Sequence, residues 1–201
     1  MPSEVWLLGN PVMGSRSPSM QNAAFRVAGI DCRYLPRELS NAELAGVMTQ
    51  MRENEQVLGA NVTIPHKQAV LPLLDSLDPL AWRVGAVNTI SRRNGRLLGS
   101  NTDVVGFSRA LDDCGYVVEC KSVLLIGAGG AARAVGEALR TRAATLMVVA
   151  REPERCYLSS GCSTCGRDGR PRDGPCSSTR APHPSRSGPA SPRRWTSCAR
   201  R

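Results

Sequence analysis

The stretch SVLLIGAGGAA at residues 122–132 decides the fold class of this 201-residue chain. Ser122 to Ile126 is a short, continuous apolar run, which is typical of a strand. Three glycines follow within four residues, and a helical pattern then runs to Leu139. Another apolar run, Thr145 to Ala150, comes next. We therefore predict a strand, a glycine-rich turn, a helix and a parallel strand, which together begin a Rossmann domain.

The glycine-rich turn predicts a nucleotide site. Gly127 allows the tight turn, and Gly129 lets the backbone approach a pyrophosphate, which the beginning of a helix attracts. The candidate cofactor-binding residues of the turn are Gly127, Ala128, Gly129, Gly130 and Ala131. The alternative is a plain turn from strand to helix.

The residues after the next strand bear on the choice of cofactor. A site selective for NAD usually has an acidic residue there, which binds the ribose 2′-hydroxyl. Here Arg151, with Arg155 close behind, can bind a 2′-phosphate instead. We expect NADP, with NAD as the second choice. The alternative for Arg151 is a solvated surface arginine.

Strand-like and helix-like stretches also alternate upstream of the glycine turn. Pro and Gly punctuate them, and Asn94-Gly95 is a strong hairpin signal. We expect strands at 5–8, 33–35, 57–63, 87–91 and 96–98, and helices at 18–28, 44–51, 67–74, 79–84 and 103–111, with Asn41 capping the second helix.

Two polar segments lie at the ends of such strands. GANVTIPHK at 59–67 ends in Lys67, and GSNTD at 99–103 ends in Asp103. Reduction of a carbonyl by hydride requires a positioned proton donor, which a lysine beside a carboxylate can supply. Lys67 and Asp103 are therefore the candidate catalytic pair. The alternative is a surface lysine and a helix-capping aspartate, and the capping role of Asp103 can accompany catalysis.

Ser15 and Ser17 precede the first expected helix, with Pro18 directly after them. Two hydroxyls beside the beginning of a helix can bind a carboxylate. The alternative is an ordinary capping serine before a proline.

Five motifs together resemble the shikimate dehydrogenase family, in order and spacing. They are GNPVMGSRSP at 9–18 with Asn22, NVTIPHK at 61–67, GAVNT at 85–89, NTDVVG at 101–106, and GAGGA at 127–131. By this resemblance, Ser15 and Ser17 hold the shikimate carboxylate. Contacts to the ring hydroxyls come from Thr63, Lys67, Asn88 and Asp103, with Lys67 and Asp103 catalytic.

The resemblance implies an NADP-dependent shikimate dehydrogenase, which reduces 3-dehydroshikimate reversibly in chorismate and aromatic amino-acid biosynthesis. One alternative is a quinate/shikimate dehydrogenase that uses NAD or NADP. Another is an inactive remnant, because the family continues well beyond residue 155. The resemblance also implies a homodimer for intact members.

The expected fold class is α/β with two domains. Residues 1–115 form an open-sheet, shikimate-binding catalytic domain, and residues 116–155 form a partial Rossmann domain. Residues 156–201 have no apolar periodicity and are rich in Pro, Gly, Ser, Arg and Cys, so we expect a disordered tail. We hypothesise that the chain is truncated or frameshifted after about residue 155.

The net charge of +9 does not make the body a nucleic-acid-binding protein. Residues 151–201 hold 11 basic and 4 acidic residues, whereas residues 1–150 hold 15 and 13. The tail has few aromatic residues for base stacking, so nucleic acid is an unfavoured partner. Its CSTC at 162–165 lacks a second closely spaced pair, so we expect no zinc. Sparse cysteines in the body and no long apolar run favour the cytoplasm over the membrane.

Overall fold

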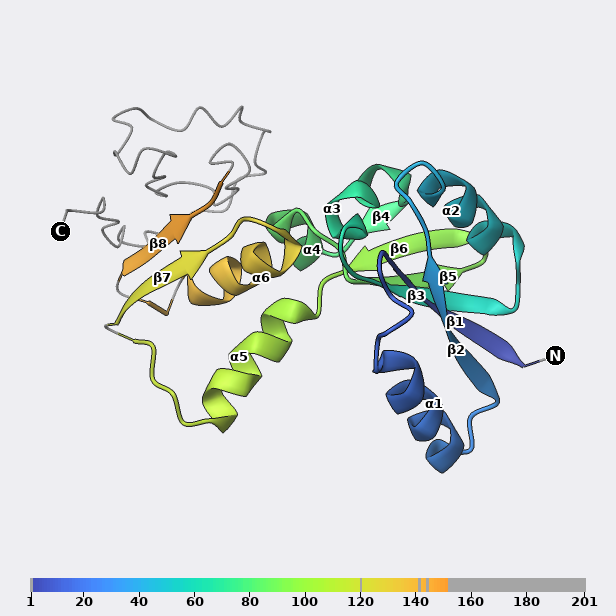
Figure 1. The fold of residues 1–201 in the computed structure, drawn as a ribbon, viewed down its shortest axis with the longest axis horizontal. Coiled ribbons are helices and arrows are strands. Elements are labelled where there is room, and N and C mark those ends of the chain that lie inside the picture. The colour runs from blue at the N-terminus through green and yellow to red at the C-terminus, as the bar shows by residue number, and fades with distance from the viewer. Residues whose placement is uncertain (1, 120, 141, 144, 152–201) are drawn as a thin grey trace. The chain divides into compact units, whose positions relative to one another are not determined.

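A computed structural model describes residues 2–119, 121–140, 142–143 and 145–151. Contacts divide the chain into two compact units, Met1–Asp103 and Val104–Arg201 (Figure 1). The predictions for the tail at 156–201 and for Arg155 concern residues outside the described ranges. Within those ranges, no helix combines the length and apolar character needed to cross a membrane.

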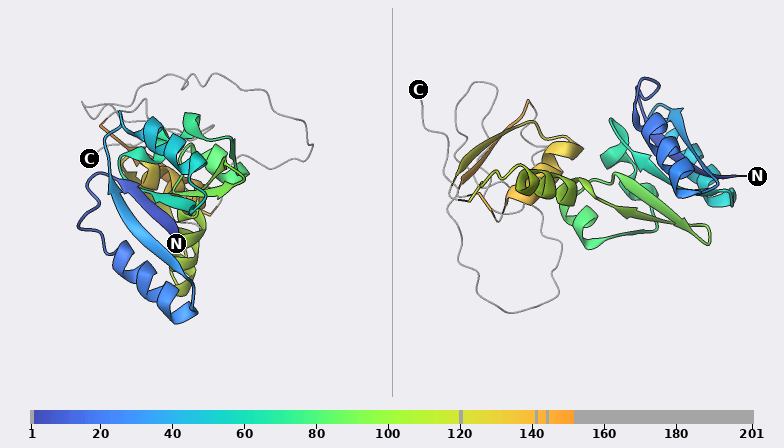
Figure 2. Two further views of the ribbon diagram at one scale, coloured as in Figure 1. Left: turned by 90° about the vertical axis from the view of Figure 1, so that its right-hand side faces the viewer. Right: turned by 90° about the horizontal axis from the view of Figure 1, so that it is seen from below.

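The first unit contains a six-stranded mixed sheet, whose strand order is β2-β1-β3-β5-β6-β4. Figure 2 shows the ribbon from two further sides. β1 pairs in parallel with β2 and β3, and β5 pairs antiparallel with β3 and β6. The strands are β1 (Ser3–Gly9), β2 (Cys32–Glu38), β3 (Val57–Val62), β4 (Ser76–Leu77), β5 (Thr89–Arg93) and β6 (Arg96–Ser100). The expected α/β class is confirmed.

Both faces of this sheet are packed against helices. The side chains of β1 alternate between the two faces and contribute to both cores. Leu7 lies on the face covered by α1 (Ser17–Ala28), where it clusters with Tyr34 and Phe25. Trp6 and Leu8 lie on the other face, in a larger core. That core includes buried residues of α2 (Leu44–Glu53), namely Leu44, Met48 and Met51. Figure 1 shows α1 and α2 on opposite sides of β1.

The structure differs from the expectations at three places. The stretch expected as one helix at 67–74 is a short α3 (His66–Ala69) followed by a 3-10 helix at Leu71–Leu73, because Pro72 cannot donate a hydrogen bond to continue the helix. β4 was not predicted, since two residues carry no periodicity. Asn41 does not cap α2, whose N-cap is Glu43 without a side-chain bond.

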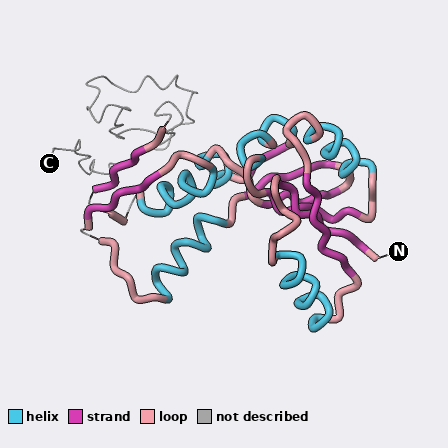
Figure 3. Tube along the Cα trace, in the orientation of Figure 1, coloured by secondary structure: helices cyan, strands magenta, loops and turns pink. Residues whose placement is uncertain are grey.

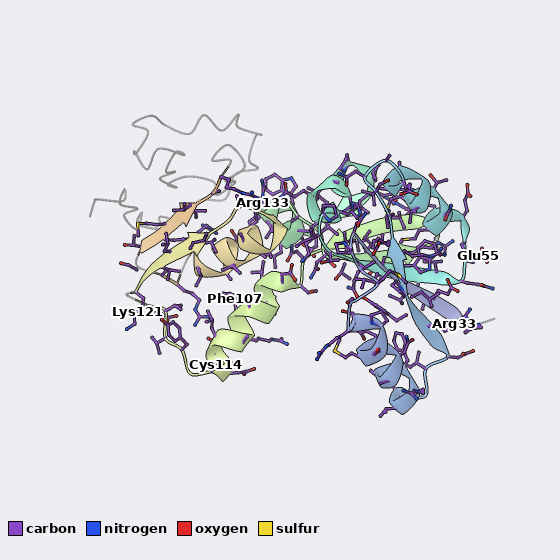
Figure 4. The ribbon with its side chains drawn as sticks, viewed as in Figure 1. Arg33, Glu55, Phe107, Cys114, Lys121 and Arg133 are labelled. Carbon is purple, nitrogen blue, oxygen red and sulfur yellow. The ribbon has the colours of Figure 1, made fainter. Side chains whose placement is uncertain are left out.

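Within the second unit, β7 (Ser122–Ile126), α6 (Gly130–Leu139) and β8 (Thr145–Val149) form the predicted strand-helix-strand unit. β7 and β8 pair in parallel. Figure 3 shows α5 (Asp103–Asp113) followed by an irregular segment that leads into β7. Phe107 of α5, labelled in Figure 4, packs on a small core that contains Leu139, Leu146 and Val148.

The packing of α5 explains where the two units divide. The sequence placed the domain boundary near Gly115, after this helix, whereas the compact units divide between Asp103 and Val104. Phe107 and Leu111 attach most of α5 to the second core. The functional division into 1–115 and 116–155 stays a prediction.

We predict that Gly59→Ala destabilises the first unit. Gly59 lies opposite Ser91 where β3 meets β5, and a Cβ there would lie 2.1 Å from the carbonyl oxygen of Ile90. Because backbone must move to admit it, we expect a loss of about 1–3 kcal/mol in the free energy of unfolding, measured by urea denaturation. Gly46→Ala is the matched control. Its Cβ would meet no atom within 4 Å, so this helical position should be unchanged or slightly stabilised. Equal effects of the two substitutions would contradict the steric argument.

Candidate active site

Lys67 is placed by the segment that joins β3 to α3. After β3 the chain turns at Thr63, Ile64 and Pro65, and the Thr63 carbonyl accepts a hydrogen bond of 2.9 Å from the His66 amide. The Lys67 carbonyl in turn accepts one of 2.8 Å from the Val87 amide. The backbone of Lys67 is thus tied to the segment that precedes β5.

His66 anchors the same turn from the inside of the protein. Its side chain is fully buried, with Nε2 2.8 Å from the Leu39 carbonyl oxygen and Nδ1 2.9 Å from the Asn41 side chain. A carbonyl can only accept, so Nε2 carries a proton and donates. Asn41 thus binds the His66 side chain and does not cap α2 as predicted.

Asp103 meets Lys67 across the end of the sheet. It is the first residue of α5, and its amide donates to Asn101 Oδ1 over 3.0 Å. Lys67 Nζ lies 2.6 Å from Asp103 Oδ2. The Lys67 side chain is 15% exposed and that of Asp103 31%, so the pair is shielded but reachable from solvent.

Asn88 completes this cluster by binding the other carboxylate oxygen. Asn88 Nδ2 donates to Asp103 Oδ1 over 2.8 Å and to Thr102 Oγ1 over 2.9 Å. The Thr102 amide donates back to Asn88 Oδ1 over 3.0 Å. Both oxygens of Asp103 are therefore engaged, one by a cation and one by an amide. The structure brings three predicted site residues into direct contact: Lys67, Asn88 and Asp103.

The other three predicted substrate contacts are Thr63, which follows β3, Ser15, which lies on a loop, and Ser17, the first residue of α1. Thr63 is half-buried, and its amide donates to the Leu8 carbonyl over 2.8 Å, which fixes it beside the end of β1. Ser15 and Ser17 are also half-buried, and the Ser17 amide donates to Ser15 Oγ over 3.2 Å. No direct bond joins either serine to the Lys67 cluster among the described residues.

Glu38 holds the loop that carries the two serines. Its Oε2 accepts from the Val12 amide over 2.8 Å and from the Met13 amide over 3.3 Å. The Ser15 amide then donates to the Val12 carbonyl over 3.0 Å. Glu38 could not be predicted as part of the site, because nothing in its own segment shows that the end of β2 lies beside this loop.

The glycine turn of the second unit has an unusual backbone conformation and open space beside it. Gly127 has a φ of +116°, in the range that favours glycine. A Cβ built on Gly129 would meet no atom within 4 Å, so open space adjoins its backbone at the beginning of α6. Ala128, Gly130 and Ala131 continue the turn into this ten-residue helix. Arg151 is exposed just beyond β8.

The comparisons with known proteins agree with this geometry. Residues 7–90 match the family described as shikimate dehydrogenase substrate binding domain. The NADP(+) shikimate dehydrogenase of Moorella thermoacetica is 46% identical over 158 residues, which cover 78% of this chain and 53% of that protein. The chain thus spans about half the length of the curated relatives it matches.

Solved structures extend the match to the fold. Shikimate dehydrogenase from Aquifex aeolicus superposes with a TM-score of 0.72 at 39% identity, covering 77% of this chain and 57% of that one. Shikimate 5-dehydrogenase from Thermus thermophilus, solved with NADP(H) and shikimate, superposes with a TM-score of 0.70 at 38% identity. The match covers 77% of this chain and 58% of that one. The chain belongs to the shikimate dehydrogenase family.

We predict that Glu38→Ala loosens the serine loop. Removing the acceptor of the Val12 and Met13 amides should speed hydrogen exchange of the Val12 amide about tenfold, since a bond to a charged group stabilises by about 1.5–3 kcal/mol. Exchange can be followed by NMR or mass spectrometry. Glu38→Gln keeps one acceptor oxygen at the same place and should stay close to the wild type. Unchanged exchange in Glu38→Ala would show that the loop is held by its other bonds.

Proposed function

We propose that this chain carries the substrate site and part of the cofactor site of an NADP-dependent shikimate dehydrogenase. The observation that carries the proposal is the Lys67–Asp103 pair at 2.6 Å, with Asn88 on the second carboxylate oxygen. A cation, a carboxylate and an amide side by side suit a ligand with several ring hydroxyls.

The proposed roles follow from the chemistry of each group. Ser15 and Ser17 bind the carboxylate of shikimate, and Thr63, Asn88 and Asp103 bind its hydroxyls. In the reducing direction, Lys67 gives a proton from Nζ to the oxygen that was the ketone of 3-dehydroshikimate. Asp103 orients the ammonium group and balances its charge. In the reverse direction the proton returns to Lys67.

The cofactor is proposed to be NADP, whose reduced form would supply the hydride in the reducing direction and whose oxidised form would accept it in the reverse direction. Gly127, Ala128, Gly129, Gly130 and Ala131 present backbone to its phosphates, and Arg151 binds the 2′-phosphate. The Moorella thermoacetica relative is an NADP(+) shikimate dehydrogenase and the Thermus thermophilus enzyme was solved with NADP(H), which supports this choice over NAD.

A cytoplasmic location fits the free thiols of Cys32 and Cys114. Pairing into a homodimer stays a prediction, as does the absence of a nucleic-acid partner.

Two measurements on the purified 201-residue chain test the proposal. Titration calorimetry with shikimate and with quinate tests binding, and the absorbance of the reduced nicotinamide tests turnover with NADP and NAD. Binding of shikimate with NADP-dependent turnover supports the whole proposal, and equal use of quinate favours a quinate/shikimate dehydrogenase. Shikimate binding without turnover supports only the substrate site. No binding would contradict the proposal.

Lys67→Met should abolish the proton transfer and keep the length of the side chain. We expect turnover to fall about 10²–10⁴-fold, the usual contribution of a positioned acid. The chain has only two lysines, so Lys121→Met is the natural control. Lys121 is exposed just before β7 (Figure 4), and its loss should leave turnover unchanged. A Lys67→Met variant as active as the control would remove Lys67 from the mechanism.

Arg151→Ala should weaken NADP selectively. Loss of a charge-assisted bond to the 2′-phosphate should raise the dissociation constant for NADP about tenfold. NAD lacks that phosphate, so its affinity serves as the internal control and should stay constant. A parallel loss for both cofactors would mean that Arg151 acts on the fold and not on the 2′-phosphate.

A further inference from the structure

A chain of polar side chains runs through the sheet of the first unit and ends at Asp103. It begins at Tyr34 on β2, which is only 3% exposed, and whose hydroxyl lies 2.9 Å from Asn61 Oδ1 on β3. Asn61 Nδ2 lies 3.2 Å from Thr89 Oγ1, and Thr89 Oγ1 lies 3.0 Å from Asn88 Oδ1. Asn88 then reaches Asp103, as described above. None of these links depends on the second unit.

Two backbone groups determine the direction of each hydrogen bond in this series of side chains. The Asn88 carbonyl, 3.3 Å from Asn61 Nδ2, can only accept, so the amide of Asn61 faces it and Oδ1 faces Tyr34. Tyr34 is therefore the donor to Asn61. At the other end, the Thr102 amide can only donate, so Asn88 Oδ1 faces it and Nδ2 faces Asp103.

Thr89 connects the two ends. Its oxygen accepts from Asn61 Nδ2, so its one hydroxyl hydrogen is directed to Asn88 Oδ1. Every hydrogen from the Tyr34 hydroxyl to the Asp103 carboxylate thus points the same way along the chain.

We propose that Tyr34 is a positioning residue of the Lys67–Asp103 site, acting through Asn61, Thr89 and Asn88. The inference rests on the proposed function for its link to substrate, but the hydrogen-bond chain itself belongs to the fold. Without the Tyr34 hydroxyl, Asn61 Oδ1 loses its donor in a part-buried position. The Asn61 amide then turns to find another, which withdraws its bond from Thr89 and leaves Asn88 less firmly oriented toward Asp103.

Tyr34 is suited to this role because both its backbone and its hydroxyl are fixed. Asn22 on α1 binds its backbone twice, accepting from the Tyr34 amide over 2.8 Å and donating to the Tyr34 carbonyl over 2.9 Å. Burial also raises the pKa of the Tyr34 hydroxyl above 10.0, so it keeps its proton and remains a donor at neutral pH.

The test uses the full chain with Tyr34→Phe, Thr89→Val and the double variant. Tyr116→Phe is the matched control, because Tyr116 is 57% exposed in the second unit. Thr89→Ser keeps the hydroxyl and should behave as the wild type. The readouts are the dissociation constant for shikimate, the thermal midpoint, and the side-chain amide resonance of Asn88 in ¹⁵N spectra, identified by its loss in Asn88→Asp.

We expect Tyr34→Phe to weaken shikimate binding by about fivefold to tenfold, in the range of one buried hydrogen bond, and to shift the Asn88 resonance. Thr89→Val should do the same. The double variant should lose little more shikimate affinity than either single variant, because both substitutions interrupt the same series of hydrogen bonds. Additive losses, or an Asn88 resonance in Tyr34→Phe at its wild-type position, would overturn the inference.

The two proposals can fail separately. If the wild type binds no shikimate, the proposed function fails. The Asn88 resonance then decides the inference alone, supporting it if the signal shifts in Tyr34→Phe and in Thr89→Val but not in Tyr116→Phe, and overturning it otherwise.

Discussion

The antiparallel pairing of β3 with β5 is the constraint on which the candidate site depends. β1, β2 and β3 run parallel. If the strand beside β3 were also parallel, its last residue, and not its first, would lie at the site. Because β5 reverses direction, the beginning of β5 lies beside the end of β3. Asn88, just before β5, therefore meets the segment that carries Lys67. β6 reverses again, and its end delivers Asp103 to the same place. The close approach of Gly59 to the Ile90 carbonyl is the steric requirement of this pairing.

Much of the architecture could be predicted because its signals are local. The apolar run at 122–126 and the glycines that follow it predicted the strand-helix-strand unit. Asn94-Gly95 predicted the β5–β6 hairpin. The φ of 51° at Asn94 and 74° at Gly95 is the conformation that such a pair adopts readily. The two-residue β4 was beyond prediction, since two residues carry no pattern, and its pairing with β6 depends on how Leu77 packs against the core.

The candidate site could be predicted only in part, for a related reason. Lys67, Asn88 and Asp103 stand in motifs that the resemblance made recognisable, and the structure brings them together. Tyr34, Thr89 and Glu38 support the site through contacts between strands that are far apart in sequence. Asn61 and Thr89 face each other only because they are paired in the register of β3 and β5. No pattern within either strand reveals that register.

The full engagement of Asp103 has a consequence for how the site selects ligands. One carboxylate oxygen is bound by Lys67 and the other by Asn88, so a hydroxyl that arrives must share these oxygens or displace a partner already in place. A ligand that brings its own donors can exchange one hydrogen bond for another, at little net cost. One that brings only carbon would displace water from these polar groups without replacing its hydrogen bonds. Discrimination here is thus a matter of matching donors to acceptors, and a molecule of the right shape with the wrong hydroxyl pattern is rejected by chemistry and not by fit.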